Sequence, residues 1–397
     1  MTFWGRGSLA AASTTKERET KLANNKLKLT LSGVAVFALL LTGCTQQASE
    51  DAGSDDTGSS TDSSSNNDTA ETTEPTSDAP APFDGDVKIA VVENSGAGDY
   101  FQQFRNGYTQ QFDAMGVEYE IYDAQADNAK QATDMETAIG SGVDAIIVRH
   151  GNADTMCPLI NDALDQGIPV VIYDIATAEC APRGIETSQS DSALAETVLA
   201  QMVADMGSDI NVGYVNVFGI APLDRRHVVW EEFKADNNWT EQFFVGRFTN
   251  SVATDNAQLV DAALKANSDV TAIFAPYDEF TKGVVSAIEQ NGMEDQVSAY
   301  GIDISNADIE VMTAPNSPWK ATAGTDPNAI GAVVARTMIM HLAGELDDNQ
   351  YQFPGALITQ DFLLENNIAN MDDLRANLPE LGITDVMSAD WIPVVSF

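Results

Sequence analysis

From residue 87 onward, short apolar runs alternate with longer segments in which apolar residues recur every three or four positions. Unbroken apolar runs are typical of strands that helices cover on both faces, and the longer spacing is typical of amphipathic helices. In the first half, the predicted strands are 87–92, 117–122, 144–148 and 169–173, with helices at 100–115, 128–140 and 153–166. In the second half, the predicted strands are 210–215, 243–247, 271–274 and 297–300, with helices at 192–206, 224–236, 254–266 and 279–290. Strands that alternate with helices in this way form parallel sheets, so we predict two α/β domains.

Three glycines at predicted helix ends agree with this pattern. Gly116, Gly142 and Gly167 each stand just before a predicted strand, where a left-handed residue commonly ends a helix. In open α/β sheets, ligands bind at the carboxyl ends of the strands. The loops that follow the predicted strands are therefore where a binding site is expected.

The N-terminal part of the chain is interpreted as a targeting segment followed by a stalk. In residues 1–43, basic residues precede an apolar stretch at 29–41 that is too short to span a bilayer, as in a secretory signal peptide. The stretch ends in Leu41-Thr42-Gly43-Cys44, which resembles the lipobox of bacterial lipoproteins and implies that Cys44 is acylated. The alternative is a buried cysteine at the end of a signal anchor. Residues 44–85, rich in Ser, Thr and acidic side chains, are predicted to be a disordered stalk.

The charge of the chain excludes two classes of partner. It has 60 acidic and 20 basic residues, a formal net charge of −40 at pH 7. Nucleic acids and anionic membrane surfaces both require a basic surface, so neither is expected as a partner of the folded domains. Adaptation to high salt and ordinary solubility both remain explanations of the acidity.

Aromatic, acidic and basic residues follow the predicted strands. Because these strand ends face a shared cleft, we take the residues there as the candidate ligand-binding set. They are Tyr100, Phe101, Arg149, Asp174, Arg226, Tyr277 and Asp303. A sugar has apolar C–H faces that pack on aromatic rings and hydroxyls that bond strongly to charged groups. The alternatives are helix packing for the aromatic pair, helix capping for the two aspartates, and a solvated ion pair with Glu231 for Arg226.

In order and spacing, residues 86–360 resemble the type I periplasmic binding proteins, the ribose- and galactose-binding family. The markers are Asp99-Tyr100-Phe101, the run 167–171 leading to Asp174, the segment 274–279 and Tyr300-Gly301-Ile302-Asp303. The resemblance implies two doubly wound parallel-sheet lobes joined by a hinge. We place the N-terminal lobe at 86–190 plus 325–354 and the C-terminal lobe at 191–324 plus 355–397, with the tail beyond about residue 366 packed along the second lobe.

The resemblance also implies roles for individual residues. Tyr100 and Phe101 would stack on the sugar, Asp174 and Asp303 would accept its hydroxyls, and Arg226, which fits better than Arg225, would donate to it. Departures from the ribose-binding pattern put ribose itself in doubt. They are Ile175 where that pattern has Arg, Tyr277 where it has Asn, and Arg149-His150 after the third strand. Together with Arg226, that basic pair leaves an anionic sugar open as a ligand.

The expected function is a lipid-anchored solute-binding protein that captures a monosaccharide or polyol for an ATP-driven importer. Its partners would be the sugar and the membrane permease, and we expect a monomer outside the cytoplasm. A sugar-sensing receptor subunit and a nucleoside-binding lipoprotein are the alternatives. We expect no catalytic residues, metal or cofactor, because the sequence has no His/Cys metal cluster and no nucleophile elbow. Asp174 and Asp303 could serve as a glycosidase pair, but carboxylates in a two-lobed binder hold hydroxyls.

A disulfide between Cys157 and Cys180 is predicted independently of the family. After acylation of Cys44, these two cysteines are the only ones left in a chain exported to an oxidising compartment. They follow the third and fourth strands of the first domain, which are neighbours in a parallel sheet of this winding. The alternative is two separate buried thiols.

Overall fold

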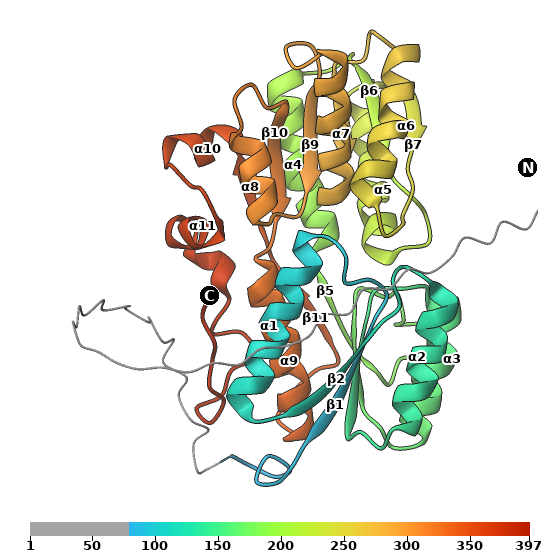
Figure 1. Ribbon diagram of the computed structural model, residues 1–397, viewed down its shortest axis with the longest axis vertical. Helices are drawn as coiled ribbons and strands as arrows, with labels where there is room; N and C mark the ends of the chain where they lie inside the picture. Colours follow the sequence, from blue (N-terminus) through green and yellow to red (C-terminus); the bar gives the residue numbers. More distant parts are fainter. Residues whose placement is uncertain (1–78) are drawn as a thin grey trace, which may run out of the picture. The chain divides into compact units, whose positions relative to one another are not determined.

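Two sheets of six strands each organise the chain (Figure 1). The computed structural model describes residues 79–397, so the predicted signal peptide, Cys44 and most of the predicted stalk lie outside the described residues. Each sheet is covered by helices on both faces and forms its own lobe. This architecture confirms the predicted fold class of two parallel-sheet α/β lobes.

The first lobe contains the described chain up to β5 and the later segment that holds α9 and β11. Its strands are β1 (Lys88–Glu93), β2 (Glu118–Asp123), β3 (Ala145–Arg149), β4 (Val170–Tyr173), β5 (Ile185–Gln189) and β11 (Gln350–Phe353). Its helices are α1 (Asp99–Met115), α2 (Asn128–Gly140), α3 (Ala153–Asp165) and α9 (Pro327–Leu342). The strand order is β11-β5-β4-β3-β1-β2, and all pairings in it are parallel.

The second lobe repeats this plan. Its strands are β6 (Asn211–Val215), β7 (Thr240–Val245), β8 (Ala272–Ala275), β9 (Ser298–Ile302), β10 (Trp319–Gly324) and β12 (Ala356–Thr359). Its helices are α4 (Asp191–Met206), α5 (Ala221–Asp236), α6 (Val252–Ala266), α7 (Asp278–Asn291), α8 (Asn306–Thr313) and α10 (Gln360–Glu365). The order is β12-β10-β9-β8-β6-β7, with β12 antiparallel to β10.

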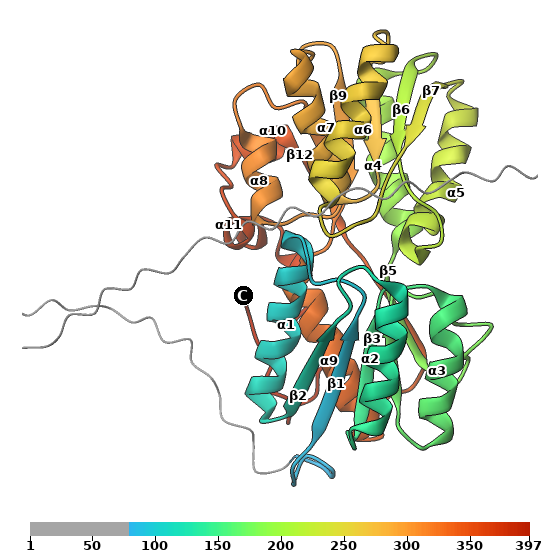
Figure 2. The same cartoon turned by 45° about the vertical axis from the view of Figure 1, so that its right-hand side comes forward.

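The pleat of β1 explains how one sheet buries two helical layers. Ile89 and Val91 belong to the core that includes α1 and α9, whereas Ala90 and Val92 belong to the core that includes α2 and α3 (Figure 2). Successive side chains of a strand point to opposite faces, so an unbroken apolar run is what a doubly covered strand requires. The end of α1 follows the prediction too, because Gly116 closes it in the left-handed region with a φ of 69°.

Three passages of the chain between the lobes form the hinge, and the C-terminal tail later returns to the first lobe. They fall between β5 and α4, between β10 and α9, and between β11 and β12. At each passage a strand from one lobe is followed within a few residues by an element of the other. A change in the relative position of the lobes would therefore change the backbone conformation of residues in these passages.

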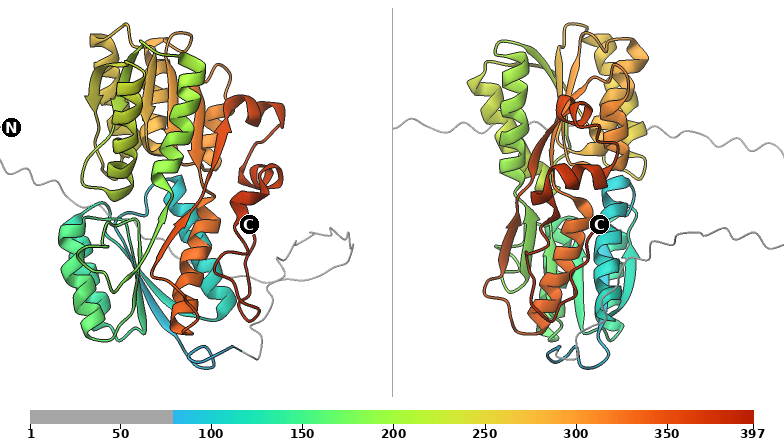
Figure 3. Two further views of the ribbon diagram at one scale, coloured as in Figure 1. Left: turned by 180° about the vertical axis from the view of Figure 1, so that it is seen from behind. Right: turned by 90° about the vertical axis from the view of Figure 1, so that its left-hand side faces the viewer.

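The C-terminal segment departs from the prediction. After α11 (Met371–Asn377) and a 3₁₀ turn (Pro379–Gly382), the chain returns to the first lobe rather than following the second (Figure 3). Arg336 of α9 donates to the carbonyl groups of Ile383 and Val386, and Gln111 of α1 donates to that of Pro393. The buried guanidinium needs acceptors that its own helix cannot supply, and the tail provides them.

The disulfide prediction is confirmed. Cys157 lies in α3 and Cys180 in the loop after β4, and their sulfurs are bonded with Cα atoms 5.8 Å apart. Asn161 donates to both of their carbonyl groups, which holds the loop against the helix. The bridge therefore fixes the loop that follows Asp174 on the first lobe.

Removing this bridge should weaken the fold. Replacing both Cys157 and Cys180 by serine is expected to lower the free energy of unfolding by about 2 to 3 kcal/mol, because the unfolded chain is no longer closed into a loop. Intact mass after alkylation, with and without reductant, counts the free thiols, and urea unfolding measures the stability. Two free thiols in the unreduced protein would contradict the assignment.

Candidate functional site

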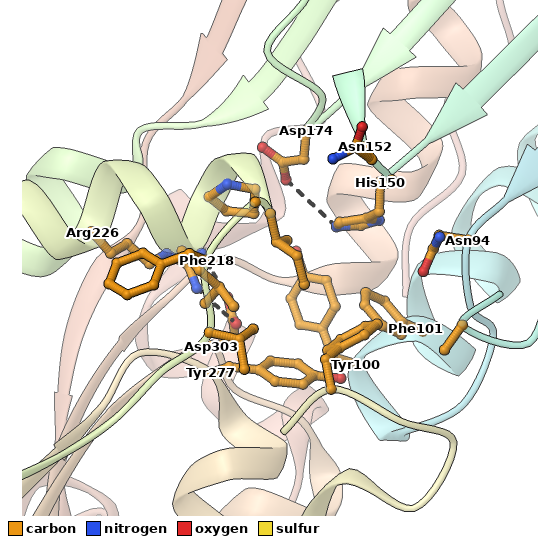
Figure 4. Close-up of a pocket in the computed structure, with 18 of the residues that line it drawn as sticks. Asn94, Tyr100, Phe101, His150, Asn152, Asp174, Phe218, Arg226, Tyr277 and Asp303 are labelled. Atoms are coloured by element: carbon orange, nitrogen blue, oxygen red, sulfur yellow. Dashed lines mark hydrogen bonds and ion pairs between the residues drawn. The ribbon is translucent and has the colours of Figure 1, made fainter. Parts of the chain in front are cut away.

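A cavity of about 290 Å³ lies where the carboxyl ends of both sheets meet (Figure 4). Its polar side chains are Asn94, Asn128, His150, Asn152, Asp174, Gln189, Arg226 and Asp303. Its aromatic side chains are Tyr100, Phe101, Phe218, Phe248 and Tyr277. Six of the seven ligand-binding residues predicted from the sequence line it; Arg149 does not.

Aromatic rings from both lobes meet in the cavity. Phe101 of α1 and Tyr277, which precedes α7, have ring centroids 5.9 Å apart, and both side chains are buried. Tyr100 lies beside Phe101, and its hydroxyl is 3.3 Å from that of Tyr173 and 3.4 Å from that of Thr325 in the hinge. The first turn of α1 thus presents one ring toward the ligand space and ties the other to the hinge.

The two predicted aspartates enter the cavity through strained backbone. Asp174 and Asp303 directly follow β4 and β9 and have φ values of 56° and 79°. Few residues with a side chain adopt this region, and those that do cluster at functional sites. Neither carboxylate caps a helix, because α4 and α8 begin elsewhere.

Both carboxylate oxygens of Asp303 have donors within the protein. Its carboxylate accepts from Arg226 at 3.2 and 3.3 Å and from Gln189 of β5 at 3.2 Å. Gln189 in turn accepts from Thr325 at 2.8 Å. Asp303, Gln189 and Thr325 therefore join the second lobe, the first lobe and the hinge in one hydrogen-bonded chain.

Asp174, by contrast, has only one carboxylate oxygen with a hydrogen-bond donor in the described part of the chain. Its Oδ1 accepts from Arg225 at 2.8 Å, whereas its buried Oδ2 has no hydrogen-bond partner among the described residues and lies 3.8 Å from His150 Nε2. Burial, and next the neighbouring Asp191 carboxylate, raise the pKa of Asp174 to about 8. A buried acceptor without a donor is costly, so a ligand hydroxyl at this oxygen would be strongly favoured.

The two arginines of α5 have different positions. Arg226 lines the cavity and donates to Asp303, Asp191 and the carbonyl group of Pro276. It is buried and does not form the solvated pair with Glu231 that the sequence left open. Arg225 bridges Asp191 and Asp174 without lining the cavity. The preference for Arg226 over Arg225 as the residue facing the ligand agrees with this geometry.

Arg149 lies behind the cavity wall. Its Nε donates to Glu93 at 2.8 Å, and its guanidinium lies 5.1 Å from the Phe101 ring and 5.0 Å from the Phe104 ring. The predicted role of Arg149 in direct ligand contact does not fit this position; it supports Phe101 instead. His150 lines the cavity in its place, and burial, followed by Arg149, holds its pKa well below the usual value.

The charges around the cavity favour a neutral ligand. His150 is uncharged at neutral pH, and Arg226 is already paired with two carboxylates. No lining cation is left without an acidic partner among the described residues. An anionic ligand, which the sequence left open because of Arg149, His150 and Arg226, is therefore not favoured.

A second contact between the lobes lies beside the cavity. Lys282 of α7 binds Asp99 of α1 across the lobes at 2.8 Å and is also 2.6 Å from Glu279. Gly98, with a φ of 94°, lets the loop approach Glu279, because a Cβ there would lie 3.1 Å from its carboxylate oxygen. Asp99 does not line the cavity, so this pair can stabilise the closed lobes without touching a ligand.

Breaking this pair should weaken binding from outside the cavity. Asp99→Asn is expected to raise the Kd for the ligand about two- to fivefold, because a partly exposed ion pair contributes up to about 1 kcal/mol to the closed form. Calorimetry measures the change, with Asp113→Asn on the exposed side of the same helix as the control. An unchanged Kd for Asp99→Asn would show that the pair does not favour closure.

Two residues of the site had no signal in the sequence pattern. Gln189 belongs to β5, whose sequence Ile-Glu-Thr-Ser-Gln lacks an apolar run. Phe248 follows β7 and was not distinguished from an ordinary core residue. Within residues 79–397, no group of His, Cys, Asp and Glu could hold a metal ion. In the same part of the chain, no helix is long and apolar enough to cross a membrane.

Comparisons with known proteins agree with this geometry. The model of the periplasmic binding protein domain family matches residues 89–346. The ribose import binding protein of Bacillus subtilis is 25% identical over 264 residues, which are 66% of this chain and 83% of that protein. A putative rhizopine-binding protein of Rhizobium meliloti is 26% identical over 259 residues, 63% of this chain and 82% of that protein.

Solved structures extend the comparison. The solute-binding protein of a 5-methylthioribose transporter from Thermotoga lettingae, solved with 5-methylthioribose, is 37% identical with a TM-score of 0.75. The match covers 77% of this chain and 97% of that one. A sugar ABC transporter protein from Yersinia enterocolitica is 30% identical, also with a TM-score of 0.75, over 78% of this chain and 94% of that one.

Proposed function

Because this chain belongs to the periplasmic binding protein domain family, we propose that it is the solute-binding protein of an ATP-driven importer and captures a monosaccharide or polyol between its lobes. It binds its ligand without converting it, as solute-binding proteins do. A pentose or a pentose derivative is the first class to consider, since the similar proteins include a ribose importer component and a 5-methylthioribose transporter component.

One observation carries this proposal: a buried carboxylate oxygen that has no hydrogen-bond partner among the described residues shares a cavity with aromatic rings from both lobes. Asp174 Oδ2 awaits a donor, and Phe101 and Tyr277 provide apolar faces from opposite lobes. A sugar ring satisfies both, because its hydroxyls donate to carboxylates and its C–H faces pack on aromatic rings.

The mechanism follows from the hinge. Closure around the sugar brings Asp174 and Phe101 of the first lobe onto the ligand together with Asp303, Arg226 and Tyr277 of the second. Thr325 and Gln189 link this closure to the passages between the lobes. Such hinge motions convert ligand binding into a change of shape that a membrane permease can recognise.

The N-terminal segment would tether this domain to the membrane. Acylation of Cys44 would attach the protein at the cell surface, and the predicted stalk at 44–85 would let the folded lobes stand away from the bilayer. Cys44→Ser is expected to release the protein from the membrane fraction into the medium or periplasm. Retention of the serine variant in washed membranes would contradict the lipid anchor.

A ligand screen tests the proposal. Purified protein is heated with pentoses, hexoses, polyols and nucleosides, and compounds that raise Tm are titrated by calorimetry. We expect a monosaccharide or polyol to bind with a stoichiometry of one and to be recovered unchanged after incubation. Stabilisation by nucleosides alone, or hydrolysis of a glycoside, would replace the proposal by another function.

A further inference from the structure

The wall that the second lobe gives to the cavity is mostly apolar. Between β6 and the first turn of α5, the lining side chains are Val217, Phe218, Ile220, Pro222 and Leu223. Nearly all the polar side chains that line the cavity come from the first lobe; the second lobe adds only Arg226 and Asp303, which bind each other. The site therefore has a polar side and a continuous apolar side.

This apolar segment is held in a defined conformation at the mouth of the cavity. The N–H of Gly219, which has a φ of 86°, donates to the carboxylate of Asp224 at 3.1 Å. A Cβ at Gly219 would lie 3.9 Å from the side-chain amide of Asn152, so the loop reaches the facing lobe. The segment is thus a fixed part of the site and spans the space between the lobes.

Phe218 is a large apolar side chain that is mostly exposed to solvent. Its side chain lines the cavity and yet is 60% exposed, with ring contacts to His227 and Phe244. Among the described residues it has the highest exposure of the large apolar side chains. Covering such a ring with apolar ligand atoms is favourable by about 25 cal/mol per Å².

A plain sugar matches this wall poorly. Its hydroxyls surround the ring, and one directed at residues 217–223 finds no side-chain donor or acceptor there. A hydroxyl buried without a partner loses its bonds to water, whereas a methyl or thioether group in the same place gains from burial. The rings of Phe101 and Tyr277, with centroids 5.9 Å apart, offer separate apolar surface for the sugar ring itself. The segment at 217–223 is therefore available to a further apolar group of the ligand.

We propose that the ligand is a sugar that carries an apolar substituent, with its hydroxyls on Asp174 and Asp303 and its substituent against Phe218 and Ile220. This inference rests on the proposed sugar-binding function and narrows its substrate class. The contiguous apolar segment and the exposed ring of Phe218 carry it.

The test is a matched series of ligands on the purified protein. Ribose, 5-deoxyribose and 5-deoxy-5-alkylthio derivatives with methyl, ethyl and propyl groups are titrated by calorimetry. The methylthio compound should bind about 10- to 100-fold more tightly than ribose, since about 1.4 kcal/mol corresponds to each tenfold. Ribose binding as tightly as the alkylthio compounds would overturn the inference and leave the proposed function standing, whereas no binding of any sugar would contradict both.

Substitutions in the apolar segment test which part of the ligand it contacts. Phe218→Ala should weaken binding of the methylthio compound about tenfold more than binding of ribose, because the substituent rather than the sugar contacts the ring. Ile220→Thr, which supplies a hydroxyl at the same place, should reduce the preference for the methylthio compound over ribose. Leu364→Ala, a similarly exposed side chain on α10, is the control. An equal loss for both ligands in Phe218→Ala would show that the loop only covers the sugar ring and would contradict the inference.

Discussion

Replacing Arg226 by alanine is expected to lower the free energy of unfolding by about 3 to 5 kcal/mol and to abolish measurable ligand binding. The guanidinium is buried between the carboxylates of Asp191 and Asp303. Once it is removed, Asp191 keeps its pair with Arg225, whereas Asp303 keeps only the amide donor of Gln189. Removing one member of a buried ion pair leaves an uncompensated charge, which is among the largest effects of a single substitution. The binding loss follows because Asp303 then loses the donor that orients it.

Urea unfolding and calorimetry measure the two effects of Arg226→Ala. Arg183→Ala is the control, since Arg183 pairs with Asp165 on the surface and its removal should change stability by less than about 1 kcal/mol. Wild-type stability in Arg226→Ala would contradict the buried charge network. Wild-type affinity would show that Arg226 does not serve the site.

Replacing Asp174 by alanine should weaken ligand binding by about 3 to 4 kcal/mol, which corresponds to a Kd 100- to 1000-fold higher. The free Oδ2 of Asp174 is the acceptor we assign to a sugar hydroxyl, and its loss leaves that hydroxyl buried without a partner. The fold should survive, because Arg225 keeps its bonds to Asp191. Calorimetry with the stabilising sugar gives the Kd, and an affinity within threefold of wild type would exclude this role.

The same carboxylate makes binding depend on pH. Burial and Asp191 raise the pKa of Asp174 to about 8, so a proton at this carboxylate competes with a donating ligand hydroxyl near neutral pH. A donating hydroxyl favours the ionised form and lowers that pKa, so binding releases a proton and the affinity rises with pH up to about 8. Calorimetry in two buffers of different ionisation enthalpy detects the proton. Asp174→Asn should remove the release, and proton uptake in the wild type would reverse the assigned hydrogen bond.

The sequence predicted the elements whose burial shows as an apolar run. Strands such as β1 and β3 are buried on both faces, so the run and the strand coincide. β5 was missed because its buried residues are polar: Thr187 donates to the carbonyl group of Ile172, and Gln189 donates to Asp303. The course of the C-terminal tail was missed because its carbonyl groups accept hydrogen bonds from Arg336, a buried residue of α9 that is distant in the sequence.

The candidate site was predictable where position along a strand decides it. Asp174 and Asp303 directly follow strands, and the carboxyl ends of parallel strands share one edge of a sheet. Arg149 was placed wrongly because the end of a strand does not reveal to which face a side chain points. It pairs in register with Glu93 of β1 and turns to that carboxylate, and the next residue, His150, enters the cavity. Gln189 and the hinge contact of Thr325 depend on lobes that meet only in three dimensions.

A crystal structure of the protein with the sugar that stabilises it most tests the central claim directly. We expect density for one sugar molecule in the cavity between the lobes, with a hydroxyl within hydrogen-bond distance of Asp174 Oδ2 and a ring face against Phe101 or Tyr277. A sugar bound elsewhere on the protein, or in the cavity without contact to Asp174 and the aromatic rings, would contradict the account.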